Sequence, residues 1–264
     1  MKKIYLFSIV AVVVLALLTS ATCSEEEDDD TSTETNSGNQ TGDKTSDNKT
    51  DDKTSDNKTD NKTDDKTDNN KTDDQTNTSA FSKEEIAKAN TAANIKSLSQ
   101  MEKDIILYCN LARLDGAKFW AEYGNNAKGS TAYVSSLESD LKSTKNLPML
   151  EPEKSLMEAA AYHANDMYQN NFFEHKSSDG TSFGARVRSY YKGNAIAENI
   201  SAGMNTAIGV VMQLLVDDGL STLGHRKNIL GAQYVAIGIK TSEHKTWRTV
   251  TVQDFGDKMI TKME

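Results

Sequence analysis

Two histidines of the chain lie beside residues that are suited to chemistry. His175 and His225 occur among acidic and turn-forming residues, and Glu198, Asp217 and Asp218 lie between them in the sequence. Imidazole nitrogens and carboxylate oxygens are the usual ligands of zinc, and carboxylates also bind calcium and magnesium. The same groups serve as general acids and bases. We therefore interpret four short segments as one site: residues 172–175, 197–200, 214–219 and 224–226.

The other two histidines, and the cysteine of the folded part, are interpreted as structural. His163 lies on the apolar face of a predicted helix, so we expect a packed and hydrogen-bonded core residue. His244 falls in the polar turn of a predicted hairpin, where we expect it to be solvated. Cys109 lies within an apolar helical stripe, where cysteine behaves as a small hydrophobic residue.

Apolar residues recur at helical spacing in the segments that would have to position these side chains. Ser82 is the predicted N-cap of a helix that runs towards Lys96, and Ser99 that of a helix over residues 101–123. Two runs rich in β-branched residues, 234–241 and 247–255, predict a hairpin. The sequence therefore predicts an α+β fold in which helices surround a small sheet. Further helices are predicted over residues 131–143, 153–170, 182–191 and 206–217, with extended chain at 148–152 and 195–200.

Residues 1–22 have the layout of a signal peptide. Lys2 and Lys3 precede an unbroken apolar run at residues 9–18, which is too short for a comfortable membrane span. Residues 20–23, Ser-Ala-Thr-Cys, resemble the lipobox of bacterial lipoproteins. We therefore expect an exported lipoprotein of the cell surface or outer membrane, attached to the membrane through a lipid anchor on Cys23. The alternative is an ordinary cleavable signal and a secreted product.

The segment after Cys23 has nothing to bury. Residues 24–79 contain no Ala, Val, Ile, Leu, Met, Phe, Trp, Tyr or Cys, so no apolar burial offsets the entropy of ordering them. We expect residues 23–80 to form a disordered, acidic tether rich in Asp, Lys, Thr and Asn. It has 18 acidic residues and 7 lysines, whereas residues 80–264 have 21 acidic and 21 basic residues. A neutral folded part argues against nucleic acid as a partner, because phosphate binding requires a basic face.

Several short motifs carry a resemblance to a known family. They include Asn-Leu-Ala-Arg at 110–113, Leu-Pro-Met-Leu at 147–150, residues 159–167, Phe-Glu-His at 173–175, Ala-Glu-Asn-Ile at 197–200, residues 214–219, Gly-His-Arg-Lys-Asn-Ile-Leu at 224–230, residues 235–239 and Asp-Phe-Gly at 254–256. With these motifs the chain from about Leu98 onward resembles the CAP superfamily of cysteine-rich secretory, antigen 5 and pathogenesis-related proteins. The likeness is strongest to the bacterial members of this family, which contain an SCP-like extracellular domain.

The resemblance implies an α-β-α sandwich over residues 98–264, after a helical lead-in at 81–97. It also implies a cleft with two histidines and two acidic residues, which binds a divalent cation in some members. By position these metal ligands are His175, Glu198, Asp217 and His225, with Asp218 as the alternative to Asp217. The chain departs from the family pattern in three ways: Ala197 replaces the usual Gly, Leu214 replaces a Trp, and the disulfides of eukaryotic members are missing.

Three functions are compatible with these residues. The first is a surface-anchored module whose cleft binds a divalent cation, zinc or alternatively calcium or magnesium, together with an extracellular lipid, glycan or peptide. The second is a metal-dependent peptidase or esterase in which Glu198, His175 or His225 is catalytic. The third is a structural or adhesin module in which the four residues tie the sandwich together. We expect a monomeric protein in each case.

Overall fold

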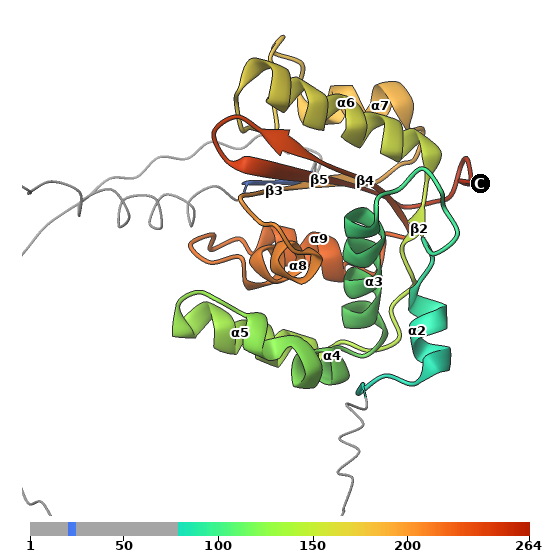
Figure 1. Ribbon diagram of the computed structural model, residues 1–264, viewed down its shortest axis with the longest axis vertical. Coiled ribbons are helices and arrows are strands. Elements are labelled where there is room, and N and C mark those ends of the chain that lie inside the picture. Colours follow the sequence, from blue (N-terminus) through green and yellow to red (C-terminus); the bar gives the residue numbers. More distant parts are fainter. Residues whose placement is uncertain (1–20, 25–78) are drawn as a thin grey trace, which may run out of the picture. The chain divides into compact units, whose positions relative to one another are not determined.

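The computed structural model describes residues 21–24 and 79–264. The predicted signal peptide at 1–22 and the predicted tether at 23–80 therefore lie outside the described residues, except for residues 21–24 and 79–80. In the described part a β-sheet lies between two layers of helices (Figure 1). This arrangement confirms the α+β sandwich that the sequence predicts.

The sheet has five strands in the order β1-β3-β5-β4-β2. Its central strand β5 (Arg248–Gly256) pairs antiparallel with β3 (Ile196–Ala202) on one side and with β4 (Ala236–His244) on the other. β1 (Ala21–Ser24) pairs antiparallel with β3, and β2 (Glu151–Pro152) runs parallel to β4 at the opposite edge. The predicted hairpin is confirmed as β4 and β5. The segment predicted to be extended at 195–200 corresponds to β3, which contains Glu198.

Helices cover both faces of this sheet (Figure 1). On one face lie α6 (Lys154–Asn170) and α7 (Phe183–Tyr190), and on the other lie α3 (Gln100–Leu114), α8 (Ala207–Val216) and α9 (Gly224–Leu230). Three further helices, α2 (Lys83–Ala89), α4 (Gly116–Tyr123) and α5 (Thr131–Ser143), pack against α3 and α8. Within the described ranges, none of the helices is long and apolar enough to cross a membrane.

Local sequence explains where several helices begin and end. Ser82 and Ser99 each form a capping box, with Glu85 and Glu102 respectively, so both predicted N-caps are confirmed. α6 ends where Asn171 adopts a left-handed conformation (φ 53°), which Asn tolerates better than most residues. The end of α6 leads into the loop that carries His175.

The helix predicted over residues 101–123 is wrong in one respect, because it is two helices. Asp115 (φ −154°, ψ 92°) ends α3, and its carboxylate accepts from Lys118 N–H at 3.1 Å to begin α4. The next residue must be small, since a Cβ on Gly116 would lie 2.2 Å from the carbonyl oxygen of Leu141 on α5. The break therefore lets α4 and α5 pack closely together.

The helix predicted to run from Ser82 towards Lys96 is shorter than expected and ends at Ala89. The amide of Asn110 on α3 donates to the carbonyl oxygens of Ala89 and Leu150 at 2.9 and 3.0 Å. A buried side chain thus satisfies a carbonyl at the end of α2, and no further helical turn is needed to do so.

The prediction that His244 is solvated is also wrong. Its side chain is buried, with Nε2 2.9 Å from the carbonyl oxygen of Phe172. Nδ1 accepts from the backbone N–H groups of Thr246 and Trp247 at 3.1 and 3.2 Å. The ring closes the turn between β4 and β5 and binds it to the chain that follows α6.

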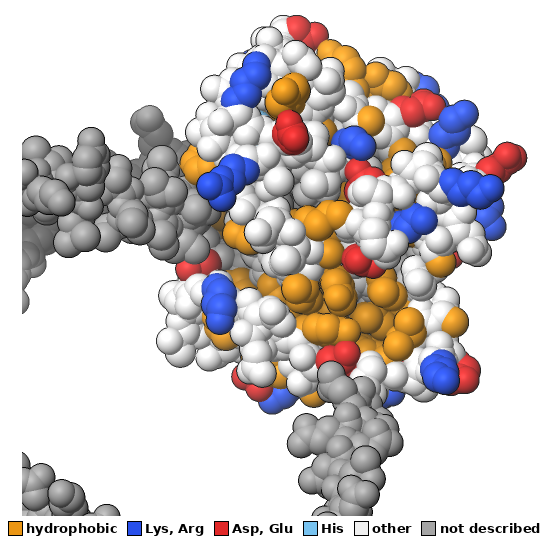
Figure 2. All heavy atoms as spheres, viewed as in Figure 1, with side chains coloured by type: hydrophobic (Ala, Val, Ile, Leu, Met, Phe, Trp, Pro, Cys, Tyr) orange, Lys and Arg blue, Asp and Glu red, His pale blue; other side chains and the backbone are white. Residues whose placement is uncertain are grey.

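The hydrophobic core is largest on the α3 and α8 side of the sheet, and two smaller clusters lie under α6 and α7. Cys109 is fully buried in the larger part, as predicted, and burial raises the pKa of its thiol to about 12. Under α6 the buried residues include Ala160 and Ala164, whose small side chains allow the helix to lie close to the sheet. On the face drawn in Figure 2, hydrophobic side chains gather around α3, and acidic and basic side chains are interspersed elsewhere.

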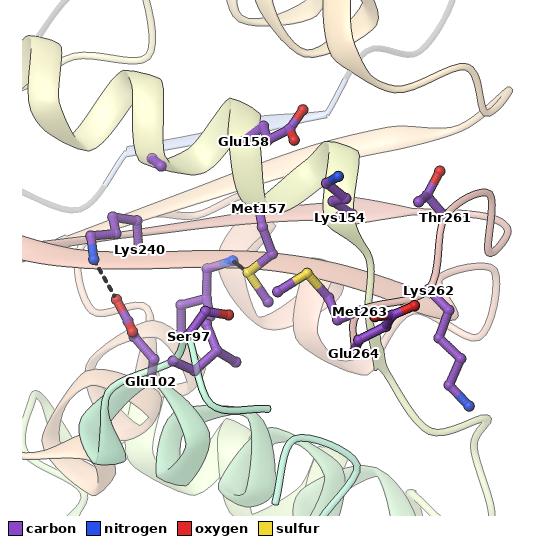
Figure 3. Close-up of a pocket in the computed structure, with 13 residues that line it drawn as sticks. Ser97, Glu102, Lys154, Met157, Glu158, Lys240, Thr261, Lys262, Met263 and Glu264 are labelled. Carbon is purple, nitrogen blue, oxygen red and sulfur yellow. Dashed lines mark hydrogen bonds and ion pairs between the residues drawn. The ribbon is translucent and has the colours of Figure 1, made fainter. Parts of the chain in front are cut away.

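β2 pairs with only the first part of the outer edge of β4, and side chains form hydrogen bonds with the part beyond it. The N–H of Ile239 donates to Sδ of Met157 at 3.1 Å, and the N–H of Thr241 donates to Oε1 of Glu102 at 3.0 Å. Glu102 is 1% exposed and also forms an ion pair with Lys240 at 3.3 Å (Figure 3). Residues of α3 and α6 therefore occupy two backbone donors of this edge.

Candidate functional site

Strand β3 places Glu198 within a group of charged side chains next to α7. Oε1 of Glu198 lies 2.8 Å from Nδ1 of His175, and Oε2 accepts a hydrogen bond from Nη2 of Arg186. The other terminal nitrogen of Arg186, Nη1, donates to the carbonyl oxygen of His175 at 2.7 Å and to Oγ of Ser177 at 3.1 Å. One guanidinium group therefore holds both the carboxylate and the backbone of the loop that carries His175.

Burial strengthens these interactions. Glu198 is 0% exposed and Arg186 is 3% exposed, whereas the side chain of His175 is 16% exposed. Burial alone would raise the pKa of Glu198, but the hydrogen bond with His175 and the charges of His163 and Arg186 outweigh it. The pKa of Glu198 falls to about 2, so the group is a carboxylate at neutral pH.

The second acid and the second histidine meet where α8 gives way to α9. Asp217 is the C-cap of α8 in a left-handed conformation (φ 57°, ψ 37°). Its Oδ1 lies 2.5 Å from Nδ1 of His225, and its Oδ2 accepts from the backbone N–H groups of His225 and Arg226 at 2.9 and 3.4 Å. Both side chains are 0% exposed. Asp217 thus fixes the imidazole and the first turn of α9 at the same time.

The neighbouring acid, Asp218, has a different role. Its two carboxylate oxygens accept from the hydroxyl and the backbone N–H of Ser130 at 2.8 and 3.1 Å, at the start of α5. Of the two acids between which the sequence leaves a choice, Asp217 is therefore the one that pairs with His225.

α7, whose Arg186 bonds Glu198, and the α8–α9 junction, which carries Asp217 and His225, lie on opposite faces of the sheet (Figure 1). Side chains alternate along a strand, so Glu198 faces α7 while Asn199 faces α9, where its amide donates to the carbonyl oxygen of His225 at 3.3 Å. Asn228 of α9 donates to Oδ1 of Asn199 at 2.9 Å. Across residues 21–24 and 79–264, no three His, Cys, Asp or Glu side chains are placed to hold a metal ion. The arrangement is two pairs on either side of a strand.

Each imidazole is nevertheless oriented as metal-binding histidines usually are. Such a histidine binds through one ring nitrogen, and the other is hydrogen-bonded to a carboxylate or carbonyl group. Nδ1 of His175 is held by Glu198, and Nδ1 of His225 is held by Asp217. Nε2 of His175 is buried and has no hydrogen-bond partner. The residues therefore fit a site in which imidazoles bind and carboxylates orient them better than a site with four protein ligands.

His163 lies on α6 above the same group of charges. It is 0% exposed, and its Nε2 lies 2.8 Å from the carbonyl oxygen of Glu174. Its Nδ1 is buried without a partner, so the predicted hydrogen-bonded core histidine is confirmed for one ring nitrogen only. Burial lowers the pKa of His163, which keeps the ring neutral at pH 7.

Sequence analysis missed two charged residues of this region, Arg186 and Asp254. Asp254 on β5 is the cross-strand partner of Glu198, is 0% exposed, and has no hydrogen-bond partner for either carboxyl oxygen. Burial and the negative charge of Glu198 raise the pKa of Asp254 well above its usual value. A signal existed in both cases, because an acid inside a β-branched run and an arginine on an apolar helix face are unusual unless they are paired.

Two residues that could act as nucleophiles have structural roles. Cys109 is fully buried with a raised thiol pKa, so little thiolate exists at neutral pH. Ser182 is the central residue of a Gly-x-Ser-x-Gly sequence at 180–184, but a turn and not a strand precedes it, unlike the nucleophile elbow of hydrolases. Its hydroxyl caps α7 by accepting from the N–H of Ala185 at 3.2 Å.

A pocket of about 630 Å³ lies apart from both pairs, between α3, α6 and the outer edge of β4 (Figure 3). Its lining includes Glu102, Met157, Lys240 and Met263. None of its lining residues belongs to either histidine–acid pair.

Residues 107–255 match the family described as "Cysteine-rich secretory protein family" (CAP). The matched residues include both histidine–acid pairs, Arg186 and Asp254. No curated protein sequence matches the chain.

Three solved bacterial structures are similar to the chain at low sequence identity. An extracellular protein containing an SCP domain from Bacillus anthracis is 21% identical, with a TM-score of 0.41 over 60% of this chain and 40% of that chain. An outer surface protein from Borrelia burgdorferi is 22% identical, with a TM-score of 0.38 over 48% and 90% of the two chains. A cysteine-rich secretory protein from Staphylococcus aureus is 17% identical, with a TM-score of 0.34 over 48% and 36%. The match spans less than half of the first and third of these proteins.

Proposed function

Because the chain belongs to the cysteine-rich secretory protein (CAP) family, we propose that it is an exported binding module in which the His175–Glu198 and His225–Asp217 pairs, on opposite sides of β3, are the sites that bind a divalent cation and, with it, an extracellular ligand. One observation carries this proposal. Each imidazole is held at Nδ1 by a buried carboxylate, as metal-binding histidines usually are, and Nε2 of His175 is buried without a hydrogen-bond partner.

The chain's own residues would set the strength and selectivity of binding. Imidazole nitrogen suits zinc better than calcium or magnesium, which prefer oxygen ligands. Because Glu198 and Asp217 are engaged by other groups, solvent or the ligand would have to complete the coordination, and we expect weaker affinity than that of a closed four-ligand site. When bound, the cation would supply positive charge to an anionic or carbonyl group of the ligand.

The segment before the folded part supplies the proposed location. A signal peptide at 1–22 would direct export, a lipid on Cys23 would attach the protein to the membrane, and residues 23–80 would tether the binding module. We expect Cys23→Ser to move the protein from the membrane fraction into the medium. Equal membrane retention of the wild type and the variant would contradict lipid anchoring.

The experiment for the binding site is calorimetric titration of the metal-stripped full chain with zinc, then with calcium and magnesium. We expect saturable zinc binding in the wild type and its loss in the double variant His175→Ala/His225→Ala. The matched control is His244→Asn, which removes an imidazole of the same fold outside the two pairs and should leave binding unchanged.

Two outcomes would overturn the proposal. A folded wild type that binds none of the three cations would remove the cation from the function, and unchanged binding in the double variant would place it elsewhere. Turnover of peptides or esters that a chelator abolishes and zinc restores would instead favour a metal-dependent hydrolase. The roles of Cys109 and Ser182 support binding over catalysis by a protein nucleophile.

A structural role is the second candidate, because one observation favours it. The Arg186–Glu198 ion pair is buried and joins α7, β3 and the loop that carries His175. A variant that loses cation binding but keeps its free energy of unfolding would support binding, whereas large destabilisation without any binding phenotype would support the structural role.

A further inference from the structure

The buried polar atoms that lack a partner are concentrated in one place. Among residues 21–24 and 79–264, five buried side-chain nitrogen and oxygen atoms have no hydrogen-bond partner. They are Nδ1 of His163, Nε2 of His175, Nε of Arg186 and both carboxyl oxygens of Asp254. All of them surround Glu198, and none belongs to the His225–Asp217 pair.

These four side chains lie on the same side of the sheet. Asp254 is the cross-strand neighbour of Glu198, so their side chains share the face that α6 and α7 cover. Arg186 and His175 contact Glu198 directly. His163 projects from α6, and the charges of Glu198, Arg186 and His175 all act on its ring. The unpartnered atoms therefore come from strand β5, from helices α6 and α7 of one layer, and from the loop that carries His175.

Buried polar atoms in folded proteins are nearly always hydrogen-bonded, either to protein or to ordered water. Single exceptions occur, but several in one group indicate a molecule between them. We propose that His163, Arg186 and Asp254 enclose a chamber that holds ordered water behind the His175–Glu198 pair. Neither the family match nor the proposed cation site assigns this role to His163 or Asp254.

The charges around the chamber favour water over an ion. The cation of the proposed function binds Nε2 of His175, outside the chamber; inside the chamber the guanidinium of Arg186 disfavours a cation, and the carboxylate of Glu198 disfavours an anion. The atoms to be satisfied include a donor, Nε of Arg186, and the carboxyl group of Asp254, which also interacts with Glu198, so the occupant must accept a hydrogen bond and be able to donate one.

The first test is the magnetic relaxation dispersion of water deuterons in solutions of the metal-stripped full chain, which reports buried water of long residence. We expect a long-lived water component in the wild type that loses amplitude, equivalent to at least one molecule, in Asp254→Leu and in His163→Phe. The matched control is Glu102→Gln, because Glu102 is an equally buried acid whose carboxylate is bonded directly by backbone N–H groups. Its amplitude should equal that of the wild type.

The second test needs no variant, so it can show whether the chamber holds water even if Asp254→Leu fails to fold. A crystal structure of the metal-stripped full chain should show water density about 2.7–3.2 Å from Asp254 and from His163. Equal water amplitude in the wild type and both folded variants would overturn the proposal. So would a chamber without density in which Asp254 bonds directly to His163. Density with contacts of about 2.0–2.2 Å would also overturn it, because those distances indicate a metal.

Discussion

The His175–Glu198 pair and the His225–Asp217 pair contain the same two kinds of side chain but differ in their surroundings. Asp217 accepts from the ring and from two backbone N–H groups of α9, and neither it nor His225 has a buried atom without a partner. Glu198 is bonded by His175 and Arg186, and atoms with spare bonding capacity surround it. The acid of one pair is therefore also bonded to the first turn of a helix, whereas unpartnered polar atoms surround the acid of the other.

The largest effect is expected from Glu198→Ala. Removal of the carboxylate leaves the guanidinium of Arg186 buried without its counter-charge, and breaking a buried ion pair in this way costs about 3–5 kcal/mol. We expect this loss in the free energy of unfolding, measured by urea denaturation. Asp218→Ala is the control, because Asp218 is more exposed and bonds only Ser130. A loss below about 1 kcal/mol in Glu198→Ala would mean that the two pairs do not differ as described.

Lowering the pH should reduce the contribution of Glu198 to the free energy of unfolding by a similar amount. The pKa of Glu198 is lowered in the folded protein, from 4.5 to about 2. Its contribution is therefore present above about pH 4.5 and is lost as the pH falls towards 2, about 3 kcal/mol in total. The pKa of His163 is also lowered in the folded state, so acid below its usual value of 6.5 destabilises the fold further. The free energy of unfolding should depend on pH more steeply in the wild type than in Glu198→Gln over this window, and identical profiles would contradict the assignment.

A smaller effect is expected from Asp217→Ala, about 2 kcal/mol, because hydrogen bonds to a charged group are lost and the left-handed C-cap becomes unfavourable. Asp217→Asn should lose less, since Asn tolerates this conformation and keeps an acceptor oxygen. Thermal unfolding of both variants measures the difference. If the Asn and Ala variants lost equal stability, the carboxylate charge alone would account for the role of Asp217.

The smallest effect, and one of opposite sign, is expected from Asp254→Asn. The pKa of Asp254 is raised in the folded protein, so its contribution is favourable at low pH and is lost as the pH rises from its usual value of 3.8 through the folded value. At pH 7 the Asn variant should therefore be more stable than the wild type, by about 1 kcal/mol. The difference should disappear near pH 4. A variant that is less stable than the wild type at pH 7 would show that Asp254 bonds something as a carboxylate.

Much of the fold could be predicted because its elements follow local rules. Ser82 and Ser99 are followed three residues later by glutamate, which identifies the starts of α2 and α3. The break at Asp115 was missed because the apolar spacing continues through it, although the Asp-Gly dipeptide is itself a turn signal. The burial of His244 depends on Phe172, which is distant in the sequence, and no local pattern contains that contact.

The site could be predicted only as a set of residues. The resemblance identified the two histidines and two acids, but their grouping depends on the alternation of side chains along β3. Glu198 and Asn199 are adjacent in the sequence and face opposite layers, so the residues that contact them belong to different sides of the sheet. Arg186 and Asp254 join Glu198 through strand register and helix placement, which are properties of the tertiary structure alone.

The hydrogen bonds that Glu102 and Met157 make with the outer edge of β4 also bear on aggregation of the protein through that edge. An exposed strand edge with free N–H groups is a template for pairing with a strand of another molecule, which is a common route to aggregation. Protein molecules at high local concentration meet often at such edges. Because two side chains already occupy this edge, a neighbouring copy would have to displace them before it could extend the sheet, so the domain is protected against edge-to-edge aggregation.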